Sequence, residues 1–334
     1  MFDLEKVIAR PEYNFLKTNP HLGKNIMFLT LGGSYAYGTN VDGSDVDIRG
    51  VAANSERDLL GLSNFEQTTD TATDTTIYGF RKYIGLILNC NPNTIEMLGC
   101  RPDSYALVSP SGQMLLANKE LFLSRKAIYS FGGYANSQLR RLQNGLSKDV
   151  SDVQKAEYTL SSCKHAIVAL ADRYGLPHDY VDVALDGTTI CVTPKQVVQA
   201  PLNAVKAFYA ELSSIIESYE SFGRRNQRAK DKSPKQLNKH AMHLVRLYLM
   251  VFDILEKGEI NTYREKDHNF LMSIRNGDFM KEDGTFMSEF FELVNEYEER
   301  LAYAGKNTSL PDRPNMAKVE ELVVEINRKN LANR

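Results

Sequence analysis

Two aspartates separated by one residue, Asp45 and Asp47, are the residues whose type and spacing most directly suggest chemistry. They open the segment 45–53 (DVDIRGVAA), which begins by alternating polar and apolar residues as a β-strand does. Because side chains two residues apart on a strand point to the same face, we expect the two carboxylates to lie close together. Carboxylates that close repel each other unless a cation lies between them, and Mg²⁺ prefers oxygen ligands. The pair therefore predicts a magnesium site.

A glycine-containing turn precedes the two aspartates. Residues 26–31 (IMFLTL) form an apolar run typical of a buried strand, and residues 32–34 (GGS) follow it. Glycine lets the backbone approach a ligand closely, and N–H groups in such a turn can bind phosphate oxygens. A phosphate-binding turn beside a metal site is what phosphoryl or nucleotidyl transfer requires. Each feature alone is weak, because an Asp-x-Asp pair beside a turn is also common in solvated loops.

The elements that would position these groups form an α/β pattern in roughly the first 120 residues. The Thr-rich segment 71–78 predicts a third strand, and residues 79–89 carry apolar side chains at helical spacing. The small polar segment 34–43 between the first two strands has room for a short helix and a turn. Asn91-Pro92-Asn93 ends the predicted helix, and TIEML after it fits either a strand or a helix.

The rest of the chain is mostly helical in pattern. Helices are predicted at about 118–145, 153–174, 195–222, 235–257, 284–304 and 316–331. Asp152 would cap the second of them, Gly175 would end it, and Pro194 would begin the third. Asp186-Gly187 between alternating segments predicts a β-hairpin near 179–192. We therefore predict a catalytic domain at 1–120 and a helical domain with this hairpin at 121–334.

Residues 31–50 (LGGSYAYGTNVDGSDVDIRG) resemble the signature of the polymerase-beta-type nucleotidyltransferase superfamily. The longer match from Gly33 to Val51 resembles a branch of predicted bacterial and phage nucleotidyltransferases that includes members found beside RNA-repair systems. Further segments that fit this branch are 74–83, 91–98, 131–142 and 239–260. The resemblance implies a polymerase-beta-like mixed sheet with helices, followed by a mostly helical C-terminal domain.

The resemblance also implies a role for each motif residue. Asp45 and Asp47 would hold Mg²⁺, for which Mn²⁺ can substitute, against the triphosphate of a nucleotide such as ATP. Gly33 and Ser34 would contact the β- and γ-phosphates. The expected reaction moves a nucleoside monophosphate to a hydroxyl group, for which an RNA end is our choice, and releases pyrophosphate.

The superfamily places a third carboxylate on a neighbouring strand. Asp74 is our choice, because it lies in the Thr-rich predicted strand just ahead of the helix; Asp70 and Glu96 are the alternatives. Asp74 would share a second metal ion and help to deprotonate the acceptor hydroxyl.

Four basic residues are predicted as further nucleotide contacts: Arg49, Lys82, His243 and Arg246. Arg49 is two residues beyond Asp47, and a salt bridge alone would also explain it. Lys82 matches a basic position of the branch, although a lysine on a helix surface is the commoner case. His243 and Arg246 share a predicted helix face with Lys239. Metal binding by His240 and His243 is disfavoured, because no third ligand is evident.

The overall charge gives no support for a general nucleic-acid binder, with 40 Lys and Arg against 42 Asp and Glu. The stretch 224–246 is locally basic, which fits either contact with a nucleic-acid backbone or a solvated linker. The four cysteines lack metal-ligand spacing, and neither a signal peptide nor a transmembrane run is present. These features predict a cytoplasmic protein without a membrane partner.

The sequence leaves three readings of function open. The first is the active, magnesium-dependent transferase, acting on RNA, on a protein or on a small molecule. The second is a nucleotide-binding regulatory or antitoxin-like protein without turnover. The third is an RNA-binding module of a repair complex, with the basic stretch 224–246 as its footprint.

Overall fold

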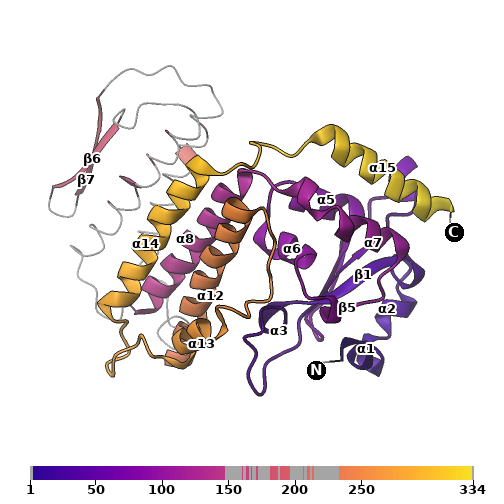
Figure 1. Cartoon of the computed structure of the whole chain (residues 1–334), viewed down its shortest axis with the longest axis horizontal. Coiled ribbons are helices and arrows are strands. Elements are labelled where there is room, and N and C mark those ends of the chain that lie inside the picture. Colours follow the sequence, from indigo (N-terminus) through magenta and orange to yellow (C-terminus); the bar gives the residue numbers. More distant parts are fainter. Residues whose placement is uncertain are drawn as a thin grey trace. The chain divides into compact units, whose positions relative to one another are not determined.

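The computed structural model describes residues 3–146 and 233–332, the segments 181–186 and 189–195, and a few further positions between 160 and 213. The chain forms two compact units, one of residues 1–140 with 234–334 and the other of residues 141–233 (Figure 1). The functional division expected at residue 120 stays a prediction. Most of the two helices predicted at 153–174 and 195–222, with their proposed caps Asp152 and Gly175, lies outside the described residues.

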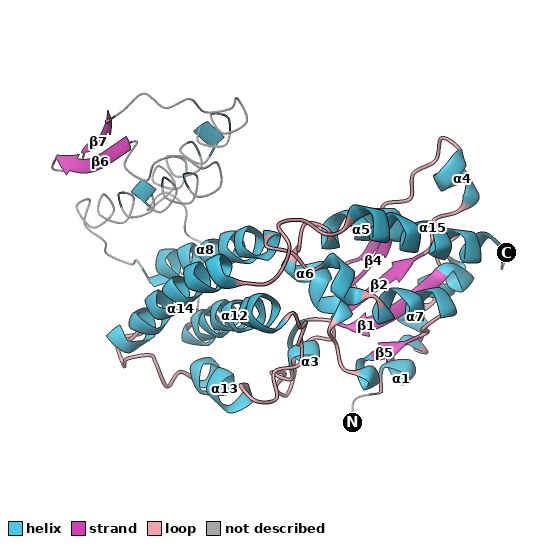
Figure 2. Ribbon diagram, turned by 45° about the horizontal axis from the view of Figure 1, so that its top comes forward, coloured by secondary structure: helices cyan, strands magenta, loops and turns pink. Residues whose placement is uncertain are grey.

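The first unit contains a five-stranded sheet in the order β3-β4-β2-β1-β5. The strands are β1 (Ile26–Leu31), β2 (Ile48–Ala52), β3 (Gln67–Asp70), β4 (Thr75–Gly79) and β5 (Tyr105–Ala106). β2 and β4 are parallel, whereas β1 is antiparallel to both β2 and β5, and β3 is antiparallel to β4. The predicted mixed sheet is therefore confirmed (Figure 2).

The register of the three central strands brings their chemically interesting ends to one edge of the sheet. Leu31, the last residue of β1, pairs with Ile48, the first residue of β2. Ile48 in turn pairs with Thr75, the first residue of β4. The turn after β1 and the residues that precede β2 and β4 therefore meet at this edge, although they are far apart in the sequence.

Helices cover both faces of the sheet. On one face, α1 (Leu4–Ile8) and α2 (Phe15–Thr18) contribute Leu4, Val7 and Leu16 to a buried cluster with Leu29 of β1. On the other face, α5 (Phe80–Ile87) packs on β2 and β4, and α7 (Pro110–Ala117) packs on β1. The C-terminal helix α15 (Met316–Ala332) packs against α7 (Figure 2).

Two predicted strands begin later than expected. The second was predicted from residue 45, but β2 begins at Ile48, because β1 and β4 offer no further pairing residues before that point. The third was predicted from residue 71, but residues 71–74 form a turn and β4 begins at Thr75. The short edge strand β3 (QTTD) was not predicted, since its polar sequence lacks an apolar face.

The segments around these strands follow the predicted pattern. A short helix, α3 (Gly33–Tyr37), follows β1, and a turn at residues 42–43 follows the helix. After α5, the Asn-Pro sequence opens the helical turn α6 (Pro92–Ile95), and the TIEML segment is helical rather than extended. In α6, the Asn91 side chain accepts a hydrogen bond from the Asn93 backbone N–H and so caps the turn.

The C-terminal part is helical, as predicted. Its long helices are α8 (Lys126–Leu146), most of which belongs to the first unit, α12 (Pro234–Phe252), α13 (His268–Asn276), α14 (Ser288–Asn307) and α15. The helix α12 continues into a π-helical turn at Asp253–Lys257. The helix α13 was not predicted. Most side chains of α12 are buried on all sides, because α13 and α14 pack against it (Figure 1).

The second unit contains the predicted hairpin. Its strands β6 (Val181–Asp186) and β7 (Thr189–Pro194) pair along their whole length, with Asp186 opposite Thr189. Pro194 is the last residue of β7, so it does not begin a helix as predicted.

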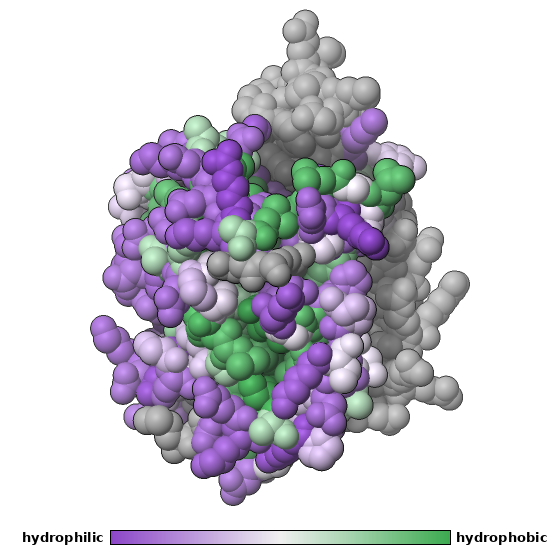
Figure 3. All heavy atoms as spheres, turned by 90° about the vertical axis from the view of Figure 1, so that its right-hand side faces the viewer, coloured by the Kyte–Doolittle hydropathy of each residue, from purple (hydrophilic) through white to green (hydrophobic). Residues whose placement is uncertain are grey.

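None of the described helices is both long enough and apolar enough to cross a bilayer. Figure 3 shows the side of the molecule that carries α1, α2 and α15, where polar side chains surround a central apolar patch. Of the described cysteines, Cys90, Cys100 and Cys163 are free thiols.

Candidate active site

Asp47 and Asp74 lie side by side at the edge of the sheet where β2 and β4 begin. Each precedes the first paired residue of its strand, and the Ile48 backbone N–H donates to the Asp74 carbonyl oxygen over 3.2 Å. The Asp47 carbonyl oxygen accepts from the Gly32 backbone N–H over 2.8 Å. These backbone hydrogen bonds extend the sheet by one residue and fix the backbone positions of Asp47 and Asp74.

The two carboxyl groups share a hydrogen bond, and their acidities diverge as a result. Burial, followed by the hydrogen bond with Asp74, raises the pKa of Asp47 from 3.8 to about 7. The same hydrogen bond lowers the pKa of Asp74, which is more exposed. With a pKa of about 7, the Asp47 carboxyl group is partly protonated near neutral pH, and a divalent cation at this place would favour its ionised form.

Arg49 is the nearest cation to both carboxyl groups. Its Nη2 lies 3.5 Å from Asp47 Oδ1 and 3.3 Å from Asp74 Oδ1. Its Nη1 also donates to the Asp74 carbonyl oxygen over 2.6 Å. Arg49 thus links the beginnings of β2 and β4 and partly neutralises the charge of Asp47 and Asp74. The salt bridge, which was the alternative to a nucleotide contact for this residue, is present.

The backbone of Asp74 adopts an unusual conformation. Its φ angle is +44°, in the left-handed region that a non-glycine residue rarely occupies. Its carbonyl oxygen bonds to Ile48 and Arg49, which hold the residue in this conformation. Since Asp and Asn tolerate the left-handed region better than most residues, the strain is compatible with an acid at this position.

Gly33 fits closely against the Asp47 carboxyl group. It has a φ of +53°, and a Cβ atom built on it would lie 1.8 Å from Asp47 Oδ2. A side chain at this position would therefore displace the carboxyl group. The predicted phosphate-binding turn and the predicted metal ligand are thus in direct contact.

Replacing Gly33 by Ala is expected to weaken nucleotide binding and to destabilise the fold. The left-handed backbone costs roughly 1–2 kcal/mol with a side chain present, and the new Cβ would also move Asp47. Gly43→Ala is the matched control, because Gly43 has a φ of +78° and a Cβ atom added to it would meet nothing within 4 Å. Equal nucleotide affinity of the two variants, measured by equilibrium binding, would contradict this role for Gly33.

The shared proton predicts a pH dependence of stability in the metal-free protein. The folded-state pKa of Asp47, about 7, lies above its ordinary value of 3.8, so the folded state binds more protons than the unfolded state between these values. The contribution of Asp47 is complete below its ordinary pKa and is lost as the pH rises through about 7. Thermal unfolding with a chelator should show this loss in the parent protein but not in Asp47→Asn.

Asp45 does not join the pair in this structure. It lies in the exposed segment before β2, two residues from Asp47, so the shared strand face expected for the two does not exist. No three His, Cys, Asp or Glu side chains among the described residues are grouped as a metal site. The donors nevertheless fit Mg²⁺, because two adjoining carboxyl groups that share a proton are oxygen ligands for which a cation would compete.

The two alternatives to Asp74 have other partners. The Asp70 carboxylate accepts from the backbone N–H and the hydroxyl group of Thr73 over 2.9 and 2.7 Å, which stabilises the turn before β4. Glu96 is buried and pairs with Arg246. Of the three candidates, Asp74 is the one whose carboxyl group bonds to Asp47, which supports its choice as the third carboxylate.

The other predicted nucleotide contacts lie in different environments. Ser34 lies beside Gly33 in the first turn of α3. Lys82 of α5 forms an ion pair with Glu66 over 3.0 Å. His243 is half-buried on α12, and Arg246 on the same helix is fully buried.

The Lys239 ammonium group is close enough to Asp47 to lower the pKa of that carboxyl group. The basic residues at 224–232 lie outside the described residues.

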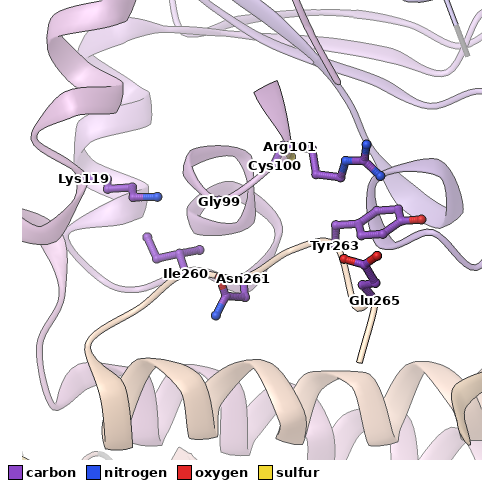
Figure 4. A pocket seen from close by; sticks show the side chains of 8 residues that line it. All are labelled: Gly99, Cys100, Arg101, Lys119, Ile260, Asn261, Tyr263 and Glu265. Carbon is purple, nitrogen blue, oxygen red and sulfur yellow. The ribbon is translucent and has the colours of Figure 1, made fainter. Parts of the chain in front are cut away.

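A cavity of about 510 Å³ lies between the segment that follows α6 and the segment that follows the π-helical turn. Its lining residues are Gly99, Cys100, Arg101, Lys119, Ile260, Asn261, Tyr263 and Glu265 (Figure 4). The guanidinium group of Arg101 lies over the Tyr263 ring, 4.6 Å from its centroid. None of the predicted site residues lines this cavity.

The mixed sheet, the glycine turn after β1 and the acids that precede β2 and β4 are arranged as expected for a polymerase-beta-like fold. Residues 8–165 match the model of the RNA repair pathway DNA polymerase beta family. This match confirms the resemblance carried by residues 31–50 and places the matched region in the polymerase-beta-type branch. No curated protein and no solved structure matches the chain significantly.

Proposed function

We propose that the protein is a magnesium-dependent nucleotidyltransferase that moves a nucleoside monophosphate from an NTP to a hydroxyl group, with an RNA end as acceptor. The observation that carries the proposal is the contact between Gly33, Asp47 and Asp74 at one edge of the sheet. The RNA acceptor is supported by the description of the matching family, which names an RNA repair pathway.

The acidic residues would hold the metal. Asp47 and Asp74 supply the first carboxylates, and Asp45 would complete the set by turning its exposed side chain toward them. When bound, Mg²⁺ would neutralise negative charge on the triphosphate and favour the ionised form of the acceptor hydroxyl. Binding would also release the proton shared by Asp47 and Asp74, because a metal ligand must be ionised.

The remaining residues would orient the nucleotide and move the proton. Backbone N–H groups of the turn at Gly33 and Ser34 would bind phosphate oxygens, while Arg49 and Lys239 supply positive charge near Asp47. The acceptor oxygen forms a bond to the α-phosphorus, and the bond to pyrophosphate breaks. Asp74, whose pKa is lowered, would accept the hydroxyl proton.

The fate of the label from each α-labelled NTP tests this proposal. The protein would be incubated with magnesium and each NTP, alone and with total RNA or total cell protein. Label on RNA supports the full proposal, and label on protein or a small molecule keeps the reaction but changes the acceptor. Nucleotide binding without label transfer to any acceptor would favour a regulatory protein instead.

A further inference from the structure

A buried ion pair joins α12 to the segment that follows α6. Arg246 of α12 is fully buried, and its Nη1 lies 3.3 Å from Oε2 of Glu96, which is also buried. The other terminal nitrogen of Arg246, Nη2, lies 3.3 Å from Nδ1 of His243. The guanidinium group therefore contacts an acid on one side and the half-buried imidazole on the other.

Tyr37 brings the third element into this cluster. Its hydroxyl group lies 2.9 and 3.0 Å from the two carboxylate oxygens of Glu96. Its ring lies under the Arg246 guanidinium group, 3.6 Å from the Cζ atom to the ring centroid. Tyr37 is the last residue of α3, which begins at Gly33. The cluster thus connects the phosphate-binding turn, α12 and the segment after α6.

The same face of α12 leads from this cluster to the carboxylate edge. Lys239, His243 and Arg246 are four and three residues apart, so they follow one another along one side of the helix. At one end of this row Arg246 is fixed in the cluster, and at the other end Lys239 lies within electrostatic reach of Asp47. Because both residues belong to one helix, the position of Lys239 relative to Asp47 depends on how α12 is held at Arg246.

Stability alone does not explain the cluster. Removing two charges from water is costly, and well-packed apolar side chains often serve as well as a buried ion pair. Arg246 also has a buried Nε without a hydrogen-bond acceptor among the described residues. The Arg246 guanidinium group instead contacts Glu96, His243, the Met250 sulfur and the Tyr37 ring in a single geometry, which apolar side chains cannot specify.

We propose that Arg246 is a positioning residue, not a nucleotide ligand: with Glu96 and Tyr37 it fixes α12 against α3, so that Lys239 faces the triphosphate site beside Asp47. This inference rests on the proposed function, because it concerns the same nucleotide site. It replaces the direct nucleotide contact that the sequence predicts for Arg246 by an action through Lys239.

The test compares stability with nucleotide affinity in one set of variants. The triple variant Tyr37→Phe/Glu96→Leu/Arg246→Met replaces the whole cluster by apolar groups, which avoids an unpaired buried charge. Thermal unfolding and equilibrium binding of each labelled NTP with magnesium would be measured for the parent, the triple variant, Lys239→Ala and their combination. Arg246→Lys is a second probe, since it keeps the charge but loses the contact with His243.

The triple variant is expected to unfold near the temperature of the parent and to bind NTP roughly tenfold more weakly. Lys239→Ala should weaken binding in the parent but add little in the triple variant, because Lys239 is already misplaced there. If the triple variant does not fold, Arg246→Lys must show weaker binding with an intact fold.

Three results would overturn the positioning role. These are parent-like affinity in the triple variant, parent-like affinity in Arg246→Lys, and an equal effect of Lys239→Ala in both backgrounds. A parent protein that binds no NTP would instead overturn the proposed function, and the positioning role with it. The two failures are therefore distinguished by the behaviour of the parent.

Discussion

Replacing Asp47 by Asn is expected to reduce nucleotide transfer by roughly 10²–10⁴-fold, while the fold stays intact. The amide has nearly the shape of the carboxyl group that Gly33 contacts, but it cannot ionise. It therefore removes the negative charge that a metal ion requires, as well as the proton shared with Asp74. Steady-state rates of pyrophosphate release measure the effect.

Asp70→Asn is the matched control for this substitution. Asp70 ends β3 on the same sheet, but its carboxylate bonds to Thr73 rather than to Asp47. The control is expected to lose some stability of the turn and to keep its transfer rate. Equal rates of nucleotide transfer in Asp47→Asn and Asp70→Asn would show that the carboxyl group of Asp47 plays no part in the reaction.

Replacing Asp74 by Asn is expected to lower transfer by a factor of roughly 10²–10⁴ as well, because the acceptor hydroxyl loses its proton acceptor. Asn tolerates the left-handed backbone at this position, where φ is +44°, so the substitution separates charge from conformation. Nucleotide binding should change less than the transfer rate, which single-turnover measurements can resolve.

Asp74→Gly tests the alternative that backbone conformation alone matters here. Glycine adopts a positive φ without strain, so this variant should keep or increase the stability of the turn. It should nevertheless be as inactive as Asp74→Asn. A transfer rate near that of the parent in either variant would move the role of third carboxylate away from Asp74.

The local order of the sheet could be predicted because its signals are local. The apolar run at 26–31, the glycine turn after it and the apolar residues from Ile48 onward specify β1, α3 and β2. Where β2 begins depends instead on its neighbours, since regular pairing with β1 and β4 starts at Ile48. For this reason the spacing of Asp45 and Asp47 did not predict that Asp45 is exposed whereas Asp47 is partly buried.

The roles of the basic residues depend on contacts that no spacing reveals. Helical periodicity places His243 and Arg246 on one face of α12, but it does not show that Glu96 and Tyr37 meet this face. Likewise, Lys82 lies near the start of α5 as predicted, and its ion pair with Glu66 comes from a different part of the chain. Tyr37 carried no sequence signal beyond its place after the motif glycine.

The charge count of the whole chain also conceals the electrostatics of the site. The net charge is −2, yet Asp47, Asp74 and Arg49 are brought together at one edge of the sheet, within 3.5 Å of one another's charged atoms in the two ion pairs. Opposite charges at such short range neutralise each other in the count, while the local field can still favour a metal-bound triphosphate. This local arrangement supports the nucleotide-handling site better than the total charge does.

Magnesium-dependent release of pyrophosphate from NTP, compared between the parent and Asp45→Ala/Asp47→Ala, tests the central claim most directly. Each NTP would be supplied with total RNA, in magnesium and in a chelator, with Asp70→Asn as a folded control. The proposed site predicts release by the parent and by the control in magnesium alone, and none by the double variant. Release by the double variant at the rate of the parent would contradict it.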